Sequence, residues 1–465
     1  MSTKIHFSGI GGVAMCAGAR LAQALGCEVR GSDTRVYPPT SQILAGMGVP
    51  VYEGYAAENL LWGPDLIVIG NALSRGNPEV EACLSDRRHF VSLPEWLKEN
   101  VLRVRRPIVI AGTHGKTTTT AITAHLFRSA GVDAGYMVGG AFQNGIPSSE
   151  LGQSGEPFIL EGDEYDAAFF DKRAKFLHYL PETTVITALE FDHADLYKDL
   201  DEIRIAFERL LRIVPKDGNV VLCADNAAAT LAESSYSRTF TYGLTPQASF
   251  FARRLSTTPE GQQFEVRHEG ASLGEFFVPL HGAHNVQNAL AALVVSELYG
   301  LPRDTVREAL RNFPGVARRL DIFHQSNGIV FVSDFAHHPT AVKATLQAAS
   351  ERWPHARRFV LFEPRSNTTV TRVFEKEYVE AFSHADVVAF GRVYRAEKIP
   401  SEQRLDTKAL AEALRQGGVE AQAFEETSQL LDFLLKQVRC GDVVLVMSNG
   451  AFDGIFDKIR AAFVS

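Results

Sequence analysis

A glycine-containing loop at residues 112–118 has residue types that suit a nucleotide triphosphate. It reads GTHGKTT, follows the apolar stretch 108–111 and precedes an expected helix. Glycines let backbone N–H groups converge on a phosphate, and the helix adds the positive end of its dipole. Lys116 is expected to bridge the β- and γ-phosphates, and Thr117 to bind Mg²⁺. The alternative is a plain glycine turn before a threonine-rich helix. The residues expected to bind the nucleotide are Gly112, Thr113, His114, Gly115, Lys116, Thr117 and Thr118.

Acidic residues follow two further apolar stretches of the chain. Residues 158–166 read FILEGDEYD, and residues 185–195 read VITALEFDHAD. Carboxylates at the carboxyl end of a parallel strand face the ligand side of an open α/β sheet. Glu161 is the first candidate ligand for Mg²⁺, with Glu164 in reserve, and His193 is the candidate for a second Mg²⁺. The alternatives are a solvated acidic loop in the first segment and a helix-capping loop in the second.

The N-terminus carries a second glycine turn, of the kind found in dinucleotide-binding folds. Residues 9–14 read GIGGVA after an expected strand, and Asp33 ends the next one about 20 residues later. Gly9, Gly11 and Gly12 are expected to hold a diphosphate, and Asp33 a ribose hydroxyl. The pattern by itself is compatible with NAD, FAD or a UDP-sugar.

Short apolar strands alternate with helical segments, which predicts an α/β protein with mostly parallel sheets. Two breaks, RVRRP at 103–107 and NFPGVA at 312–317, separate these segments. They divide the 465 residues into three expected domains, 1–106, 107–314 and 315–465. Residues 249–278 alternate polar and apolar types between glycines and predict an antiparallel patch inside the middle domain.

Charge and composition exclude several classes of protein. A net charge of −8 provides no basic surface for nucleic acid or an anionic membrane. The N-terminus lacks a signal-peptide pattern, and no apolar run approaches the roughly 18 residues of a transmembrane helix. The five cysteines form no CxxC pair, which is typical of a reducing compartment. We therefore expect a cytoplasmic protein that acts on small molecules; the oligomeric state is not specified.

Together these motifs resemble the Mur ligase family over essentially the whole chain. The other segments that carry the resemblance are NALSRGNP at 71–78, HGAHNVQNALAA at 281–292, RRLD at 318–321, DFAHHPTA at 334–341, EPRSNT at 363–368 and MSNGAFDGI at 447–455. The resemblance implies an N-terminal Rossmann-like domain that binds a UDP-sugar and a central P-loop ATPase-like domain. It also implies a C-terminal Rossmann-like domain that binds a peptide acceptor and closes over ATP.

The resemblance also implies roles for individual residues. Those assigned to the nucleotide are Asn288 and His284 near adenine, Asp334 at the ribose, and Arg318 or Arg319 at the phosphates. Asn71 belongs to the segment expected to bind the sugar nucleotide. Lys116, His193 and Arg319 are the residues expected to act in catalysis.

Recognition of an acceptor with carboxylates calls for arginine, because its guanidinium can make two parallel hydrogen bonds. Arg365 is the candidate, and Ser366 and Asn367 are expected to add hydrogen bonds. The alternative for Arg365 is a surface arginine that happens to follow a strand.

The resemblance implies an ATP-dependent ligase that forms an amide bond through an acyl phosphate, with ATP and Mg²⁺ as cofactors. The chain is most similar to family members that join UDP-N-acetylmuramate to the murein tripeptide L-alanyl-γ-D-glutamyl-meso-diaminopimelate in peptidoglycan recycling. Residues 362–369 read FEPRSNTT, where the alanine-adding relative has a FQPHRYTR-like segment. This difference favours an acceptor with its own carboxylates. The alternatives are the ligase that adds free L-alanine, an NAD(P)-dependent oxidoreductase and a nucleotide-binding switch.

Overall fold

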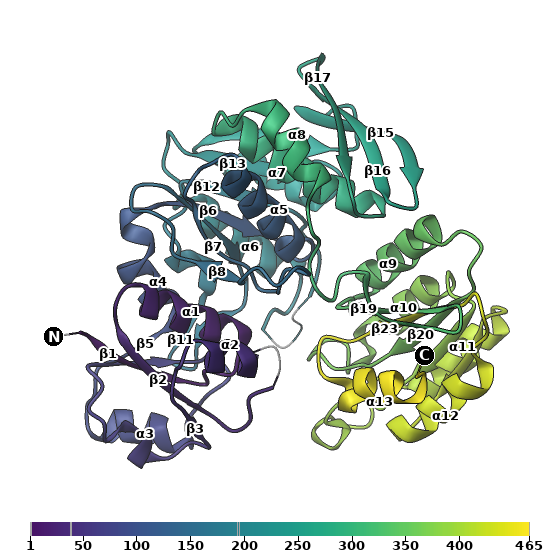
Figure 1. Ribbon diagram of the computed structural model, residues 1–465, viewed down its shortest axis with the longest axis horizontal. Coiled ribbons are helices and arrows are strands. Elements are labelled where there is room, and N and C mark those ends of the chain that lie inside the picture. The colour runs from purple at the N-terminus through teal and green to yellow at the C-terminus, as the bar shows by residue number, and fades with distance from the viewer. Residues whose placement is uncertain (1, 38–39, 193, 195, 465) are drawn as a thin grey trace.

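Three sheets, each with its own helices, follow one another along the chain in a computed structural model, which describes residues 2–37, 40–192, 194 and 196–464. Figure 1 shows the N-terminal lobe in purple, the central lobe in blue to green and the C-terminal lobe in green to yellow. The α/β architecture and the mostly parallel sheets confirm the predicted fold class.

The N-terminal sheet has five parallel strands in the order β3-β2-β1-β4-β5. Its strands and helices are β1 (Lys4–Ser8), α1 (Val13–Ala24), β2 (Glu28–Asp33), α2 (Thr40–Gly46), β3 (Val51–Glu53), β4 (Leu66–Ile69), α3 (Pro78–Ser85), β5 (Phe90–Ser92) and α4 (Leu93–Asn100). The strand order reverses direction between β1 and β4, which is where open sheets of this kind bind ligands. The turn at residues 9–12 follows β1 and therefore lies at this reversal.

The central sheet has ten strands in the order β17-β16-β15-β14-β13-β12-β6-β9-β7-β8. Its strands are β6 (Arg106–Ala111), β7 (Gly135–Met137), β8 (Ser149–Glu150), β9 (Pro157–Gly162), β12 (Thr183–Ile186), β13 (Asn219–Cys223), β14 (Arg238–Gly243), β15 (Phe250–Thr258), β16 (Gly261–His268) and β17 (Ala271–Val278). Its helices are α5 (Lys116–Ser129), α6 (Leu200–Leu211), α7 (Ala283–Leu298) and α8 (Arg303–Arg311), and β10 (Asp166–Ala168) pairs separately with β11 (Asp171–Ala174). The antiparallel pairing of β15, β16 and β17 confirms the patch predicted at residues 249–278.

In this sheet β6 lies between β12 and β9, and all three strands are parallel. Their carboxyl ends therefore lie at one edge, where the phosphate loop follows β6 and the two acidic segments follow β9 and β12. β6 and β9 are almost entirely buried, because α5 and the other helices cover the sheet. This packing fixes the edge on which the candidate site is built.

The C-terminal sheet has six strands in the order β18-β19-β23-β20-β21-β22, and only the edge strand β18 is antiparallel to its neighbour. Its elements are β18 (Asp321–Ser326), β19 (Ile329–Asp334), α9 (Pro339–Arg352), β20 (Arg358–Phe362), α10 (Glu375–Phe382), β21 (Val387–Phe390), α11 (Thr407–Gln416), β22 (Glu420–Ala423), α12 (Thr427–Gln437), β23 (Val443–Met447) and α13 (Ile455–Ala462).

The apolar cores divide the molecule unequally. One buried cluster runs through the N-terminal and central lobes, from Ile5 to Val316. The C-terminal lobe has two clusters of its own, which include Val360 and Phe359 respectively. Its contacts with the central lobe described below are largely polar, and the rings of Phe191 and Phe374 add one edge contact between the two lobes. Within the described part of the chain, no helix combines the length and apolarity needed to cross a bilayer.

Candidate active site

The phosphate loop is a tight turn between β6 and α5. Gly112 and Gly115 have φ angles of 131° and 81°, which favour glycine. A Cβ on Gly112 would lie 2.3 Å from Thr187 Oγ1, and one on Gly115 would lie 2.5 Å from Asn288 Oδ1. A side chain at either position would therefore disturb both the turn and its neighbours. Thr113 N donates to Ala188 O at 3.0 Å, which ties the turn to the segment after β12.

Lys116 is the first residue of α5 and lies over the acidic segment that follows β9. Its Nζ atom is 2.7 Å from Glu164 Oε2, and the two side chains are 12% and 0% exposed. Burial alone would lower the pKa of Lys116, but the carboxylates of Glu164, Asp163 and Glu161 outweigh it and raise that pKa. The lysine is therefore held as an ammonium at the N-terminus of the helix, where it can meet a phosphate.

Glu161, Thr117 and Arg319 converge beside this lysine. Thr117 Oγ1 donates to Glu161 Oε2 at 3.2 Å, and Arg319 Nη2 is 3.5 Å from the same hydroxyl oxygen. The backbone N–H of Gly139 donates to Glu161 Oε1 at 2.6 Å. Burial, together with Asp163, raises the pKa of Glu161 to about 7. A hydroxyl and a carboxylate at this spacing are oxygen donors of the kind that Mg²⁺ binds.

The segment after β12 lies between the central and C-terminal lobes. Glu190 Oε2 accepts hydrogen bonds from His114 Nε2 at 3.2 Å and from Thr340 Oγ1 at 2.8 Å. Thr368 Oγ1 donates to Asp192 Oδ1 at 3.1 Å. The candidate metal ligand His193 lies outside the described residues, so its role stays a prediction.

Helix α7 brings its polar first turns against the phosphate loop. Asn288 Oδ1 accepts from Thr119 Oγ1 at 3.2 Å, and Asn288 Nδ2 donates to Asn285 Oδ1 at 3.1 Å. His284 is half-buried, and burial lowers its pKa to about 4. The structure thus places Asn288 beside Gly115 and α5. Its expected position near adenine, and that of His284, stay predictions.

The side chains of Arg318 and Asp334 make hydrogen bonds within the C-terminal lobe. The Arg318 guanidinium donates to the carbonyl oxygens of Ser448 and Gly450, and burial lowers its pKa. Asp334 accepts from Leu320 N at 2.8 Å and from Ala336 N at 2.7 Å. These contacts fasten the chain that enters the lobe, whereas Arg319 points toward the central lobe and Thr117. The predicted contacts of Arg318 with phosphate and of Asp334 with ribose stay predictions.

The expected acceptor residues follow β20, at the carboxyl edge of the C-terminal sheet. Arg365 Nη1 is 3.2 Å from Glu363 Oε1, and its guanidinium carbon lies 3.9 Å from the centre of the Tyr394 ring. A Cβ on Gly450 would lie 2.0 Å from Arg365 Nε, so glycine leaves the room that the guanidinium occupies. The neighbouring Ser366 donates to Thr369 Oγ1 at 3.0 Å, and Asn367 is exposed. Arg365 is thus held at the ligand edge with a stacked guanidinium.

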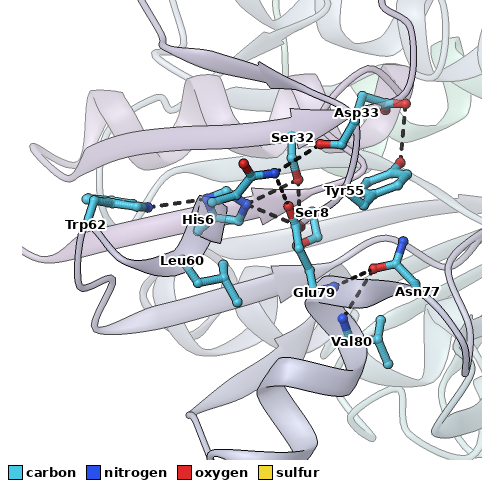
Figure 2. Close-up of polar contacts among 12 residues, drawn as sticks. His6, Ser8, Ser32, Asp33, Tyr55, Leu60, Trp62, Asn77, Glu79 and Val80 are labelled. Carbon is cyan, nitrogen blue, oxygen red and sulfur yellow. Dashed lines mark hydrogen bonds and ion pairs between the residues drawn. The ribbon is translucent and has the colours of Figure 1, made fainter. Parts of the chain in front are cut away.

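The N-terminal turn is bonded to the carboxylate of Asp33, which Figure 2 shows beside the Tyr55 hydroxyl. Asp33 Oδ2 accepts from Gly11 N at 2.9 Å, and Asp33 Oδ1 accepts from Tyr55 OH at 3.2 Å. Gly9 has a φ of 89°, and Asn71 lies exposed just after β4. Gly12 precedes α1, so the helix N-terminus opens from the turn, as a diphosphate site requires.

A buried glutamate below this turn went unnoticed in the sequence. Glu79 Oε2 accepts from Ser8 Oγ at 2.5 Å and from Ser32 Oγ at 2.6 Å, while Oε1 accepts from Asn59 Nδ2 at 2.7 Å. Figure 2 shows Glu79 reaching from α3 to the two serines, with His6 beside it. This network joins β1, β2 and α3 beneath the turn. The only signal in the sequence is an acid at the start of a helix, which is usually exposed.

Comparison with known proteins identifies the family of this fold. Three family models match successive parts of the chain: "Mur ligase family, catalytic domain" at residues 4–105, "Mur ligase middle domain" at 110–296 and "Mur ligase, glutamate ligase domain" at 318–450. The UDP-N-acetylmuramate–L-alanyl-γ-D-glutamyl-meso-2,6-diaminoheptandioate ligase of Escherichia coli is 38% identical, over 98% of this chain and 97% of that protein. The chain belongs to the Mur ligase family.

Two further relatives show how the similarity extends across this family. The UDP-N-acetylmuramate–L-alanine ligase of a Geobacter species is 35% identical, over 96% of this chain and 95% of that protein. The crystal structure of a murein peptide ligase from Psychrobacter arcticus has a TM-score of 0.77 at 33% identity, with 99% of each chain covered. Mur ligases are ATP-dependent enzymes that form amide bonds, so this chain is an ATP-dependent ligase of that class.

The side chains around the phosphate loop of this Mur ligase fit the two groups that such a reaction needs. The Gly112–Gly115 turn is a cradle that a Cβ would fill, with a buried ammonium at its end, as a triphosphate requires. Thr117 and Glu161 supply a hydroxyl and a carboxylate for Mg²⁺. Glu164, the alternative metal ligand, pairs with Lys116 instead, so Glu161 is the better placed of the two carboxylates.

Proposed function

We propose that this Mur ligase joins the lactyl carboxylate of UDP-N-acetylmuramate to the N-terminal amine of L-alanyl-γ-D-glutamyl-meso-diaminopimelate, with ATP as the energy source. The observation that carries this proposal is the buried Lys116–Glu164 pair beside the Thr117–Glu161 pair, at the mouth of a glycine turn. The names of the relatives from Escherichia coli and Psychrobacter arcticus support the choice of substrates.

Activation of the carboxylate brings two anions together, so the site must neutralise charge. In our proposal Lys116 and Arg319 face the transferred phosphoryl group, and Thr117, Glu161 and His193 hold Mg²⁺. Bound Mg²⁺ supplies positive charge that lowers the repulsion between carboxylate and phosphate. A carboxylate oxygen attacks the γ-phosphorus, the bond from that phosphorus to ADP breaks, and an acyl phosphate results.

The acceptor amine then attacks the acyl carbon. The bond from that carbon to the phosphate oxygen breaks, phosphate leaves with the oxygen that came from the carboxylate, and the amine loses a proton. Arg365 supports a peptide acceptor because its guanidinium is fixed on Tyr394 at the ligand edge, where a carboxylate can meet it. Ser366 and Asn367 would add hydrogen bonds.

The N-terminal lobe supports a sugar diphosphate. Gly9, Gly11 and Gly12 form the turn in front of α1, with Asp33 beneath it and Asn71 at the end of the neighbouring strand β4. In our proposal Asp33 orients the turn through Gly11 N and presents its other oxygen to a ribose hydroxyl.

The proposal is tested by an acceptor panel scored by phosphate release with UDP-N-acetylmuramate and ATP. The panel contains L-alanine, the L-alanyl-γ-D-glutamate dipeptide, the tripeptide and longer murein peptides. We expect the tripeptide to give the highest kcat/KM. A higher kcat/KM with free L-alanine would overturn the proposal.

That outcome would support the second candidate, a UDP-N-acetylmuramate–L-alanine ligase. One observation favours it. The Thermotoga maritima structure with that name has a TM-score of 0.81, above the 0.77 of the murein peptide ligase, although its identity is lower, at 26%. Arg365 could pair with the carboxylate of either acceptor, so the acceptor panel decides between the two ligases.

A further inference from the structure

The described part of the segment after β12, residues 190–192 and 194, touches both the phosphate loop and the C-terminal lobe. From its first residue, Glu190, the backbone N–H donates to Thr113 Oγ1 at 3.2 Å. The Glu190 carboxylate lies between His114 of the phosphate loop and Thr340 of α9. One side chain thus links two lobes whose apolar cores are separate.

His338, the residue before α9, makes hydrogen bonds both to the N-terminus of that helix and to this segment. Its Nδ1 accepts from Thr340 N at 3.3 Å and so caps the helix, while its Nε2 is 3.2 Å from Phe191 O. These partners require the neutral tautomer with the proton on Nε2. Burial lowers the pKa of His338 to about 4, which agrees with that form.

A second contact holds the other end of the segment. Thr368 Oγ1 donates to Asp192 Oδ1 at 3.1 Å and accepts from Ala194 N at 3.2 Å. Thr368 belongs to the EPRSNT stretch, three residues after Arg365. The candidate acceptor loop and the segment that carries the candidate metal ligand are therefore joined by one threonine.

The ligand atoms of His114, Glu190 and His338 lie within 4.8 Å of one another, so a metal ion is the other use for this cluster. Both ring nitrogens of His338 already have partners in the helix cap and at Phe191 O. Glu190 is likewise bonded to two donors. A metal would have to replace these bonds, so the observed geometry favours a hydrogen-bonded junction.

We propose that residues 190–192 and 194 form an interdomain clasp, in which Glu190 is a positioning residue that transmits docking of the C-terminal lobe to the phosphate loop. Thr340 holds the carboxylate from α9, and the carboxylate holds the His114 imidazole in the turn. Docking of the C-terminal lobe thereby fixes the loop that grips the triphosphate. The inference rests on the proposed role of that loop in ATP binding, but not on the identity of the acceptor.

The test is a double-mutant cycle on Thr340 and Glu190, with phosphate release measured for the full chain and whichever acceptor the wild type uses. Loss of a hydrogen bond to a charged group is worth about 10-fold to 100-fold, so we expect Thr340→Val to lower kcat about 10-fold. Thr340→Ser keeps the hydroxyl and should restore most of this loss. In a Glu190→Leu background, Thr340→Val should have little further effect, because residue 190 then offers no acceptor for the Thr340 hydroxyl.

Thr427→Val is a matched control. Thr427 also lies at the start of a helix in the C-terminal lobe, and its hydroxyl donates to the carboxylate of Asp453 at 3.0 Å, away from the junction. We expect this variant to keep the wild-type kcat. The KM for the sugar nucleotide should stay constant throughout, since that substrate is assigned to the N-terminal lobe.

Three results would overturn the clasp. They are a Thr340→Val protein with wild-type kcat, a Thr340→Ser protein as slow as Thr340→Val, and effects of Thr340→Val and Glu190→Leu that multiply. A wild-type protein that releases no phosphate with any acceptor would instead overturn the proposed function. The two failures are therefore distinguishable.

Discussion

The two glycine turns of this protein are built alike and completed differently. Each follows a parallel strand and opens a helix, at residues 9–12 and 112–115. Beneath the N-terminal turn, Asp33 accepts the Gly11 N–H from within the same lobe. The phosphate loop instead receives Arg319 and, through Glu190, Thr340 from another lobe. One turn is complete within its lobe, whereas the other depends on how two lobes meet.

The cores explain this difference. The N-terminal and central lobes share a continuous apolar cluster, while the C-terminal lobe packs its own clusters. A junction made largely of polar contacts can open at lower cost than a buried apolar one. A site that must bind ATP and an acceptor in turn gains access from such a junction. The difference between the two turns leads to the following expected outcomes.

The largest expected effect comes from the phosphate loop itself. Lys116→Ala removes the buried ammonium, and loss of one such stabilising group typically costs about 3–4 kcal/mol in the transition state. We expect phosphate release to fall roughly 100-fold to 1,000-fold. Lys172→Ala is the control, because Lys172 is 70% exposed and pairs with Asp166 outside the loop. Equal rates for the two variants would remove the loop from the mechanism.

The next effect lies at the acceptor edge of the C-terminal lobe. Arg365→Gln should raise the KM for the tripeptide about 10-fold to 100-fold, since a charged hydrogen bond is lost. The KM for ATP should not change. Arg365→Lys should behave much like the glutamine variant, because lysine lacks the planar fork. Arg460→Gln, in an exposed pair with Asp457, is the control; a tripeptide KM unaffected by Arg365→Gln contradicts the assignment.

A smaller effect is expected at the N-terminal turn. Asp33→Asn weakens the bond to Gly11 N and removes a charge, so the KM for the sugar nucleotide should rise about 10-fold. Asp65→Asn is a matched control, because Asp65 also accepts a backbone N–H, that of Lys4 at 2.8 Å, but precedes β4 at the opposite end of the sheet. If the ATP KM changed instead, the two turns would not be independent.

Acid should destabilise the junction of the central and C-terminal lobes before it destabilises the N-terminal lobe. Burial lowers the pKa of both His284 and His338 to about 4, whereas a histidine of the unfolded chain has a pKa of about 6.5. Stability near the junction therefore falls as pH drops from about 6.5 to about 4, because the unfolded state binds more protons. Burial acts to raise the pKa of Glu79, but hydrogen bonds from His6, Ser32, Ser8 and Asn59 outweigh it. Because the pKa of Glu79 is lowered, the stability that its ionised side chain contributes is lost only when the pH falls below the ordinary pKa of a glutamate.

Hydrogen exchange at each pH would check this order, with α9 expected to lose protection before α3. His338→Asn keeps a side-chain oxygen for the cap and should reduce the acid-induced fall in Tm by about 2–4 °C. His355→Asn, at an exposed position, should leave the fall unchanged. Loss of protection in α3 first would contradict the assignment of these pKa shifts.

Much of the site could be predicted because its residues lie in short, recognisable stretches of the sequence. GTHGKTT after an apolar strand predicts the turn, and parallel strands bring their carboxyl ends to one edge, which places Glu161 near Thr117. The partners across the junction have no such signal. Glu190 and Thr340 are 150 positions apart, and the direction in which each side chain points depends on how the lobes pack. The buried Glu79 was missed for the same reason, since its partners lie on β1, on β2 and in the 3₁₀ helix Ala57–Leu60.

The assignment of Glu164 illustrates a finer limit. Spacing alone made it an alternative to Glu161, because Glu161 lies near the end of β9 and Glu164 just after it. The structure pairs Glu164 with Lys116 and Glu161 with Thr117, through a turn of the chain that spacing does not define. Local patterns therefore predict which residues reach the edge, while packing decides what each one contacts.

In our proposal the phosphate loop directs a carboxylate onto the γ-phosphate of ATP. This step is tested with UDP-N-acetylmuramate labelled with ¹⁸O in the lactyl carboxylate and mass analysis of the phosphate released during turnover. Activation as an acyl phosphate predicts one labelled oxygen in each phosphate, because the carboxylate oxygen leaves with the phosphoryl group. Unlabelled phosphate accompanying amide formation would contradict the account.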